Sequence, residues 1–194
     1  IFDIDLDINS FKPDLIISFD VASIEQLWTP YEKYSDIFKN TPFVNIDHHP
    51  WNPLFWTVNI IDSEACSACE IVYDLMFSMW FEKYLNEEVA TLLLMWIITD
   101  TNSFFNTNTT SKALEKSSNL MKISKRHQEL IINLFKRKNF NKIKLWWKIL
   151  ENLKDIKNSQ IVWWTVPKSY FVQTWTNDKD ISWFIDEFLM TIDN

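Results

Sequence analysis

Two adjacent histidines and the acid before them are the residues of this chain best suited to metal chemistry. His48 and His49 are two of the 3 histidines among 194 residues, and Asp47 precedes them. An aspartate that binds one imidazole nitrogen sets the tautomer and leaves the other nitrogen free for a metal. Imidazole and carboxylate ligands suit divalent ions such as Mn²⁺, and two such ions can bind a phosphoryl group and generate a hydroxide nucleophile. The motif therefore indicates metal-assisted phosphoester chemistry.

Two further acids stand where they could join the histidines. Asp20 ends the short apolar run 14–20, and Asp100 follows the apolar stretch 86–99. A buried acid needs a partner, and a metal ion is a suitable one. Ligands of parallel sheets bind at the carboxyl ends of the strands. We expect Asp20 and the Asp47-His48-His49 run to lie at such ends.

The elements that position these side chains alternate along the chain. Short apolar runs predict strands at 14–20, 41–47 and 57–62, and helical spacing predicts helices at 63–84, 86–99, 110–121 and 125–136. Ser63 is the expected N-cap of the first long helix. The 86–99 helix is apolar nearly all round, which predicts that it is buried. The fold class is therefore α/β, a parallel sheet with helices on both faces.

A second unit is expected after a helical linker. We place a catalytic domain at 1–122, the linker at 123–144 and the start of a second α/β domain at 145–194. In the latter we expect a helix at 142–153, a polar turn at 155–159, strands at 160–166 and 170–174, and a helix at 181–192.

The composition of the chain limits its expected binding partners and its expected location in the cell. The net charge of −7 argues against a protein that coats duplex DNA. No apolar run reaches the length of a membrane span, and the acidic first residues do not resemble a signal peptide. We expect a cytoplasmic protein without membrane contact. The lone C-x-x-C of Cys66 and Cys69 lacks the further ligands of a structural zinc site and suits two small, partly buried helix residues.

Glycine is absent, and there are 11 tryptophans. At the usual ~7% glycine, a chain of this length carries about 14. Trp51, Trp56 and Trp175 stand in loops, where glycine is normally needed for positive φ angles, and Trp146-Trp147 and Trp163-Trp164 are unusual adjacent pairs. We hypothesise that most of these tryptophans are glycines in the natural protein. Its source would read the codon UGA as glycine.

Four segments resemble motifs of the DHH-family phosphoesterases. The segment 14–23 resembles the second motif of the family, and 46–50, Ile-Asp-His-His-Pro, resembles the third, which names it. The segment 62–70 resembles the stretch that follows. The segment 97–104 resembles the fourth motif, with Trp96 in the place of one glycine and Asn102 in the place of another. Asn adopts positive φ more readily than most residues.

The resemblance implies a role for each candidate residue. Asp20 would bridge two Mn²⁺ ions, with Mg²⁺ or Co²⁺ as alternatives, and His48 and Asp100 would complete the second metal site. His49 would face the phosphate, and Asp47 would support the histidine pair. From about residue 145 the chain resembles the start of the DHH-associated substrate-binding domain.

The implied substrate is short single-stranded RNA or a small nucleotide, because the resemblance is nearest to bacterial oligoribonucleases that also hydrolyse 3′-phosphoadenosine 5′-phosphate. Alternatives are a cyclic dinucleotide phosphodiesterase, a RecJ-like single-strand exonuclease and a catalytically inactive regulatory module. The histidine-containing first motif and the C-terminal substrate loop of the family are absent. We therefore expect an internal fragment of a longer protein, inactive by itself, and a homodimer is a further expectation.

Overall fold

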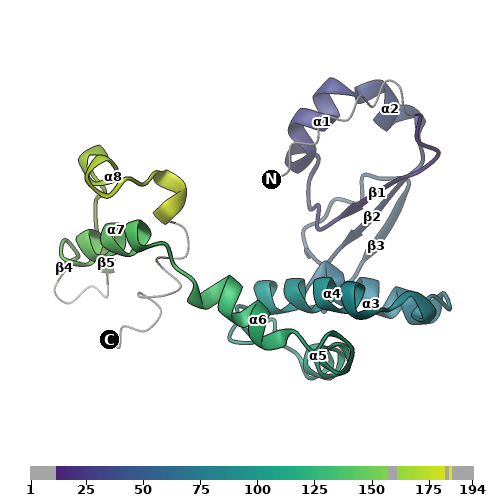
Figure 1. Cartoon of the computed structure of the whole chain (residues 1–194). Coiled ribbons are helices and arrows are strands. Elements are labelled where there is room, and N and C mark those ends of the chain that lie inside the picture. Colours follow the sequence, from purple (N-terminus) through teal and green to yellow (C-terminus); the bar gives the residue numbers. More distant parts are fainter. Residues whose placement is uncertain (1–11, 157–160, 182–183, 185–194) are drawn as a thin grey trace. The chain divides into compact units, whose positions relative to one another are not determined.

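The computed structural model describes residues 12–156, 161–181 and 184. The chain divides into two compact units, one ending at Ile131 and the other beginning at Ile132 (Figure 1). This division lies inside the segment 123–144 that the sequence suggests as a linker. Within the part of the chain that is described, no helix combines the length and the apolar character that a membrane crossing requires.

The first unit is built on a three-stranded parallel sheet. Its strands are β1 (Ile16–Phe19), β2 (Phe43–Asp47) and β3 (Val58–Ile61), in the order β1-β2-β3. In the register, Phe19 lies beside Ile46 and Asp47 lies beside Ile61. All three strands therefore end at the same edge, and the α/β prediction is confirmed (Figure 1).

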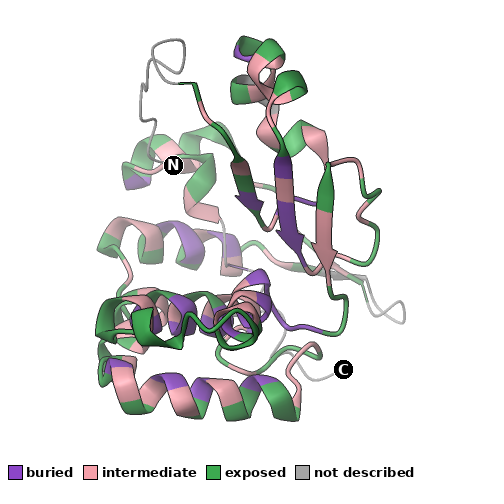
Figure 2. Ribbon diagram, turned by 90° about the vertical axis from the view of Figure 1, so that its right-hand side faces the viewer, coloured by how far each residue is buried: buried purple, intermediate pink, exposed green. Residues whose placement is uncertain are grey.

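Helices pack on both faces of this sheet, and successive residues of β2 point to opposite faces, so both faces supply core side chains. On one face, Phe43 stacks on Phe38 of α2 (Ser35–Asn40), with ring centroids 5.8 Å apart. On the other face, Ile46 packs with Ile71 of α3 (Ala68–Ser78). This double coverage leaves β2 the most buried of the three strands (Figure 2).

The other helices of the unit extend from this sheet. They are a 3₁₀ turn (Ile24–Leu27), α1 (Trp28–Lys33), a second 3₁₀ turn (Glu82–Tyr84), α4 (Glu87–Asp100), α5 (Ser111–Ser124) and α6 (His127–Ile131). The prediction that α4 is buried all round is wrong. Leu94 and Ile97 are fully buried, whereas Leu92 and Trp96 are about half exposed. Its neighbours α3 and α5 cover only part of its surface.

The N-cap of helix α3 lies four residues after the one predicted at Ser63. Its N-cap is Ser67, whose side chain accepts a hydrogen bond from the Glu70 backbone N–H. Glu70 in turn accepts from the Cys66 backbone N–H at 2.8 Å and from Lys116 Nζ at 2.9 Å. Ser67 thus satisfies one N–H of the first turn, Glu70 binds the backbone N–H of the residue before the cap, and Ser63 stays outside the helix.

In its described residues, the second unit has a pair of short antiparallel strands and two α-helices. It contains a π-helical turn (Ile132–Lys136), α7 (Phe140–Leu150), the antiparallel strands β4 (Lys154–Ile156) and β5 (Ile161–Trp163), α8 (Lys168–Thr174) and a 3₁₀ turn (Asp178–Ile181).

Two predictions in this unit are wrong. The segment 170–174, expected as a strand, is helical, because Tyr170 and Phe171 pack as helix residues against the core around Leu145 and Ile149. Residues 155–156, expected in a turn, belong to β4. Most of the helix expected at 181–192 lies outside the described residues.

Candidate metal centre

Four side chains meet at the carboxyl edge of the sheet. Asp20 follows β1, Asp47 ends β2, and His48 and His49 lie in the loop after it. One ligand atom from each of the four lies within 4.8 Å of the others. The parallel register brings these residues together, since neighbouring strands present their final residues at one edge.

Asp47 orients the other residues of this cluster. It is fully buried, and its Oδ1 accepts hydrogen bonds from the His48 backbone N–H at 2.8 Å and from His49 Nδ1 at 2.7 Å. Its Oδ2 accepts from Asn52 Nδ2 at 2.7 Å. Burial raises the pKa of this carboxyl, but the hydrogen bonds from Asn52, His49 and His48 outweigh it and lower the pKa. Because both oxygens are already engaged, Asp47 suits support of the histidines better than metal binding.

The hydrogen bonds of the two imidazoles determine which nitrogens remain free. His48 Nδ1 lies 3.2 Å from the carbonyl oxygen of Ala65, so this nitrogen carries the proton of the neutral ring. Its Nε2 is then a lone-pair donor and lies 3.2 Å from Asp20 Oδ1 and 3.9 Å from Asp100 Oδ2. His49 donates its Nδ1 proton to Asp47 and keeps its own Nε2 free. The neighbouring Asp20 carboxylate raises the pKa of His48.

Asp20 adopts a backbone conformation that is uncommon for residues other than glycine. Its φ angle is 61°, in the left-handed region, which costs a non-glycine residue of order 1 kcal/mol. Its Oδ1 is buried, and no described group gives it a hydrogen bond of good geometry, although His48 Nε2 is near. Strain and an unsatisfied carboxylate oxygen at one residue indicate a position selected for function.

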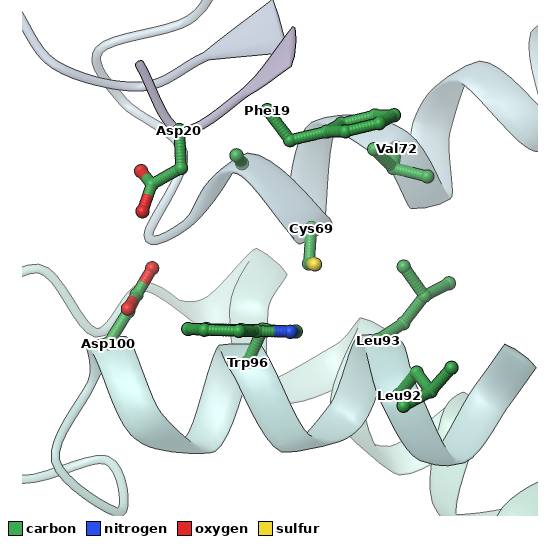
Figure 3. A pocket seen from close by; sticks show the side chains of 9 residues that line it. Phe19, Asp20, Cys69, Val72, Leu92, Leu93, Trp96 and Asp100 are labelled. Atoms are coloured by element: carbon green, nitrogen blue, oxygen red, sulfur yellow. The ribbon is translucent and has the colours of Figure 1, made fainter. Parts of the chain in front are cut away.

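Asp100, the last residue of α4, completes the cluster from the opposite side. Figure 3 shows its carboxylate facing that of Asp20. Burial and the negative charge of Asp20 raise the pKa of Asp100 to about 6. Two carboxylates that face each other, an unsatisfied oxygen and a free imidazole nitrogen are the donor set that a divalent cation prefers. The residues present therefore fit a divalent metal ion.

Comparison with known proteins identifies relatives of this chain. No protein-family model matches the chain. The bifunctional oligoribonuclease and PAP phosphatase NrnA of Bacillus subtilis is 28% identical over 155 residues, which cover 79% of this chain and 48% of that protein. This match indicates distant homology to that NrnA protein and agrees with the DHH-family resemblance of the sequence motifs. The uncharacterized protein MG371 of Mycoplasma genitalium is 33% identical over 117 residues, 60% of this chain and 34% of its relative.

A solved structure shows the same fold. The exopolyphosphatase-related protein from Bacteroides fragilis matches with a TM-score of 0.84 at 19% identity, over 94% of this chain and 53% of that one. The likeness in fold therefore covers residues of both units. The chain spans about half the length of this structure, and half or less of the relatives that it matches in sequence.

A cavity of about 450 Å³ opens beside Asp20 and Asp100 of this cluster. Phe19, Asp20, Ala68, Cys69, Val72, Leu92, Leu93, Trp96 and Asp100 line it. Its walls are apolar apart from the two aspartates, and Trp96 lies alongside Asp100 on the same helix (Figure 3). Cys69 and Cys66 are free thiols, and burial raises the pKa of each to about 12. Neither thiol is therefore a nucleophile at neutral pH.

The structure brings all five residues singled out in the sequence, Asp20, Asp47, His48, His49 and Asp100, into one site. It also adds two that the sequence did not single out, Asn45 and Asn52. Asn45 lies within β2 two residues before Asp47, and Asn52 follows it by five. Only their nearness to the histidines could have drawn attention to them. Asn102, expected to accept a positive φ in place of glycine, has a φ of 47°.

Proposed function

We propose that this chain carries the metal-binding part of a Mn²⁺-dependent phosphoesterase that hydrolyses short oligoribonucleotides, 3′-phosphoadenosine 5′-phosphate, or both. The observation that supports it most is the position of His48 Nε2, which lies 3.2 Å from Asp20 Oδ1 and 3.9 Å from Asp100 Oδ2 while Nδ1 of the same ring faces the Ala65 carbonyl. The matched relative from Bacillus subtilis is named for both substrates, and the alignment with it includes most of this chain.

Each residue has a separate task in this proposal. Asp20, His48 and Asp100 would hold the cation, with Asp20 shared between two ions in the whole protein. A pair of divalent cations supplies positive charge to a phosphoryl group and makes water more acidic. His49 would present its free Nε2 to the phosphate, and Asp47 holds that ring through Nδ1. The cavity beside the carboxylates gives the site a largely apolar wall.

The test is a hydrolysis assay of the complete protein with Mn²⁺ and four substrates: a short RNA, 3′-phosphoadenosine 5′-phosphate, a cyclic dinucleotide and single-stranded DNA. We expect turnover of the first two and a loss of at least a hundredfold in kcat for Asp100→Asn. Glu88→Gln, a change in an exposed acid of the same helix, should keep wild-type activity. Preference for the cyclic dinucleotide or the DNA would replace the proposed substrate. A protein that binds Mn²⁺ and hydrolyses none of them would instead be a binding module.

A further inference from the structure

Two asparagine side chains converge on the carbonyl oxygen of Val21, the residue after the strained Asp20. Asn45 Nδ2 donates to it at 2.8 Å and Asn52 Nδ2 at 3.0 Å. A carbonyl oxygen has two lone pairs, so these two donors saturate it. We call Asn45 and Asn52 together the amide clamp. It joins the turn after β1 to β2 and to the loop that follows β2.

The Oδ1 atom of each asparagine in the clamp also accepts a hydrogen bond. Asn45 is fully buried, and its Oδ1 accepts from Ser18 Oγ at 2.8 Å. Asn52 donates from the same Nδ2 to Asp47 Oδ2, and its Oδ1 accepts from the Leu54 backbone N–H at 3.0 Å. Rotating the Asn52 amide by half a turn would place its oxygen against a carbonyl and a carboxylate. The contacts of Asn52 therefore allow one orientation.

The clamp acts on a turn that is restrained on both sides of Asp20. The backbone N–H of Asp20 donates to the Ile46 carbonyl at 2.9 Å, which continues the β1–β2 ladder by one residue. After Val21, the N–H groups of Ala22 and Ser23 both donate to Gln26 Oε1, at 2.6 and 3.1 Å. Between these restraints, the clamp fixes the direction of the Val21 carbonyl and so helps to keep the φ of Asp20 at 61°.

We infer that Asn45 and Asn52 are positioning residues of the metal centre: they hold Asp20 in the conformation that aims its carboxylate at His48, and Asn52 couples this to the orientation of Asp47. The inference rests on the proposed function, because it concerns the metal that Asp20 would bind. Neither asparagine is a metal ligand in this arrangement, since their amide groups are already engaged in hydrogen bonds.

The test measures binding of Mn²⁺ alone by titration calorimetry and the visible absorption of the Co²⁺ form, without substrate. The variants are Asn52→Leu, Asn45→Val and the double change. Asn59→Leu is the matched control, because Asn59 lies on β3 beside Asn45 and its side chain donates to the Trp56 carbonyl rather than to the site. Circular dichroism of each variant establishes that it is folded before metal is added.

We expect Asn52→Leu to weaken Mn²⁺ binding about tenfold or more and to alter the Co²⁺ spectrum, with Asn59→Leu unchanged. The double variant should lose less than the product of the two single losses, since both amides act through one carbonyl. A folded Asn52→Leu protein with wild-type affinity and spectrum would overturn the clamp and leave the proposed function intact. A wild-type protein that binds no Mn²⁺ would overturn both.

Discussion

His49 Nδ1 lies 2.7 Å from Oδ1 of Asp47, a carboxylate with no solvent exposure. Replacing one oxygen of this buried carboxylate by an NH₂ group should therefore have a clear effect on the stability of the protein. Asp47 Oδ1 accepts hydrogen bonds from His48 and His49, and Oδ2 accepts one from Asn52.

We therefore expect Asp47→Asn to lower the free energy of unfolding by about 2 kcal/mol at pH 7, because its amide places donors against donors in a buried site. Urea denaturation measures the change. The folded-state pKa of Asp47 lies below the unfolded value, so its stabilisation is present above the unfolded pKa and is lost as pH falls through the folded pKa. The difference between variant and wild type should thus shrink in acid. An unchanged difference at pH 3 would contradict this account.

Asp100 should make the metal-free protein less stable as pH rises. Its pKa of about 6 exceeds the ordinary value of 3.8, so the protonated form favours folding and this stabilisation is lost as pH rises through 6. In EDTA at pH 8, Asp100→Asn should be more stable than wild type by roughly 2 kcal/mol, and the two should agree at pH 3. Thermal or urea unfolding measures this, with Glu88→Gln as the control.

Adding Mn²⁺ at pH 8 should reverse this order. A ligand at a hundred times its Kd stabilises the folded state by about 2.7 kcal/mol, and the variant lacks one of the proposed ligands. The affinity of the wild type should also fall as pH drops below 6, where Asp100 takes up a proton. If Asp100→Asn were less stable than wild type in EDTA at pH 8, the facing carboxylates would not repel each other as we infer.

The start of α3 offers a paired test of local structure. Ser67→Ala removes the acceptor for the Glu70 N–H and should lower the free energy of unfolding by about 1 kcal/mol. Ser63→Ala, four residues earlier and outside the helix, should change it by less than half of that. Denaturant midpoints of the two single variants give the comparison. Equal effects would mean that the helix begins earlier than the structure places it.

The tryptophan hypothesis gains two structural observations and remains a prediction. Trp80 and Trp175 have φ angles of 60° and 57° at the ends of α3 and α8, and their exposed fractions are 80% and 87%. Such helix ends favour glycine. Trp146 differs, because it is buried and its Nε1 donates to the Asp180 carbonyl at 2.8 Å.

Mass spectrometry of the native protein should therefore find glycine at 51, 80, 96 and 175. Peptides with tryptophan at these positions would refute the hypothesis. In the chain as printed, Trp80→Gly and Trp175→Gly should each stabilise the protein by about 1 kcal/mol, since they relieve a left-handed conformation. Trp146→Gly should destabilise it by roughly 3–5 kcal/mol through loss of core packing. The urea midpoints of the three variants measure the contrast.

Sequence reasoning was strongest where a residue's chemistry is independent of its partners. Two histidines behind an aspartate, and acids at the ends of apolar runs, are informative by type and spacing alone. It failed where local preference competes with packing. The β-prone residues 170–172 form a helix because they cover the core of the second unit. The N-cap of α3 is Ser67 rather than Ser63, because Glu70 lies three residues beyond Ser67.

By itself the sequence determined the α/β class, the parallel strands and the identity of Asp20, Asp47, His48, His49 and Asp100 as candidates. Only the tertiary structure decided how they act on one another. Which imidazole nitrogen is free depends on the Ala65 carbonyl, 17 residues from His48, and the direction of the Val21 carbonyl depends on Asn45 and Asn52, 24 and 31 residues away. Such hydrogen bonds follow from the packing of distant segments, which residue type and spacing do not specify.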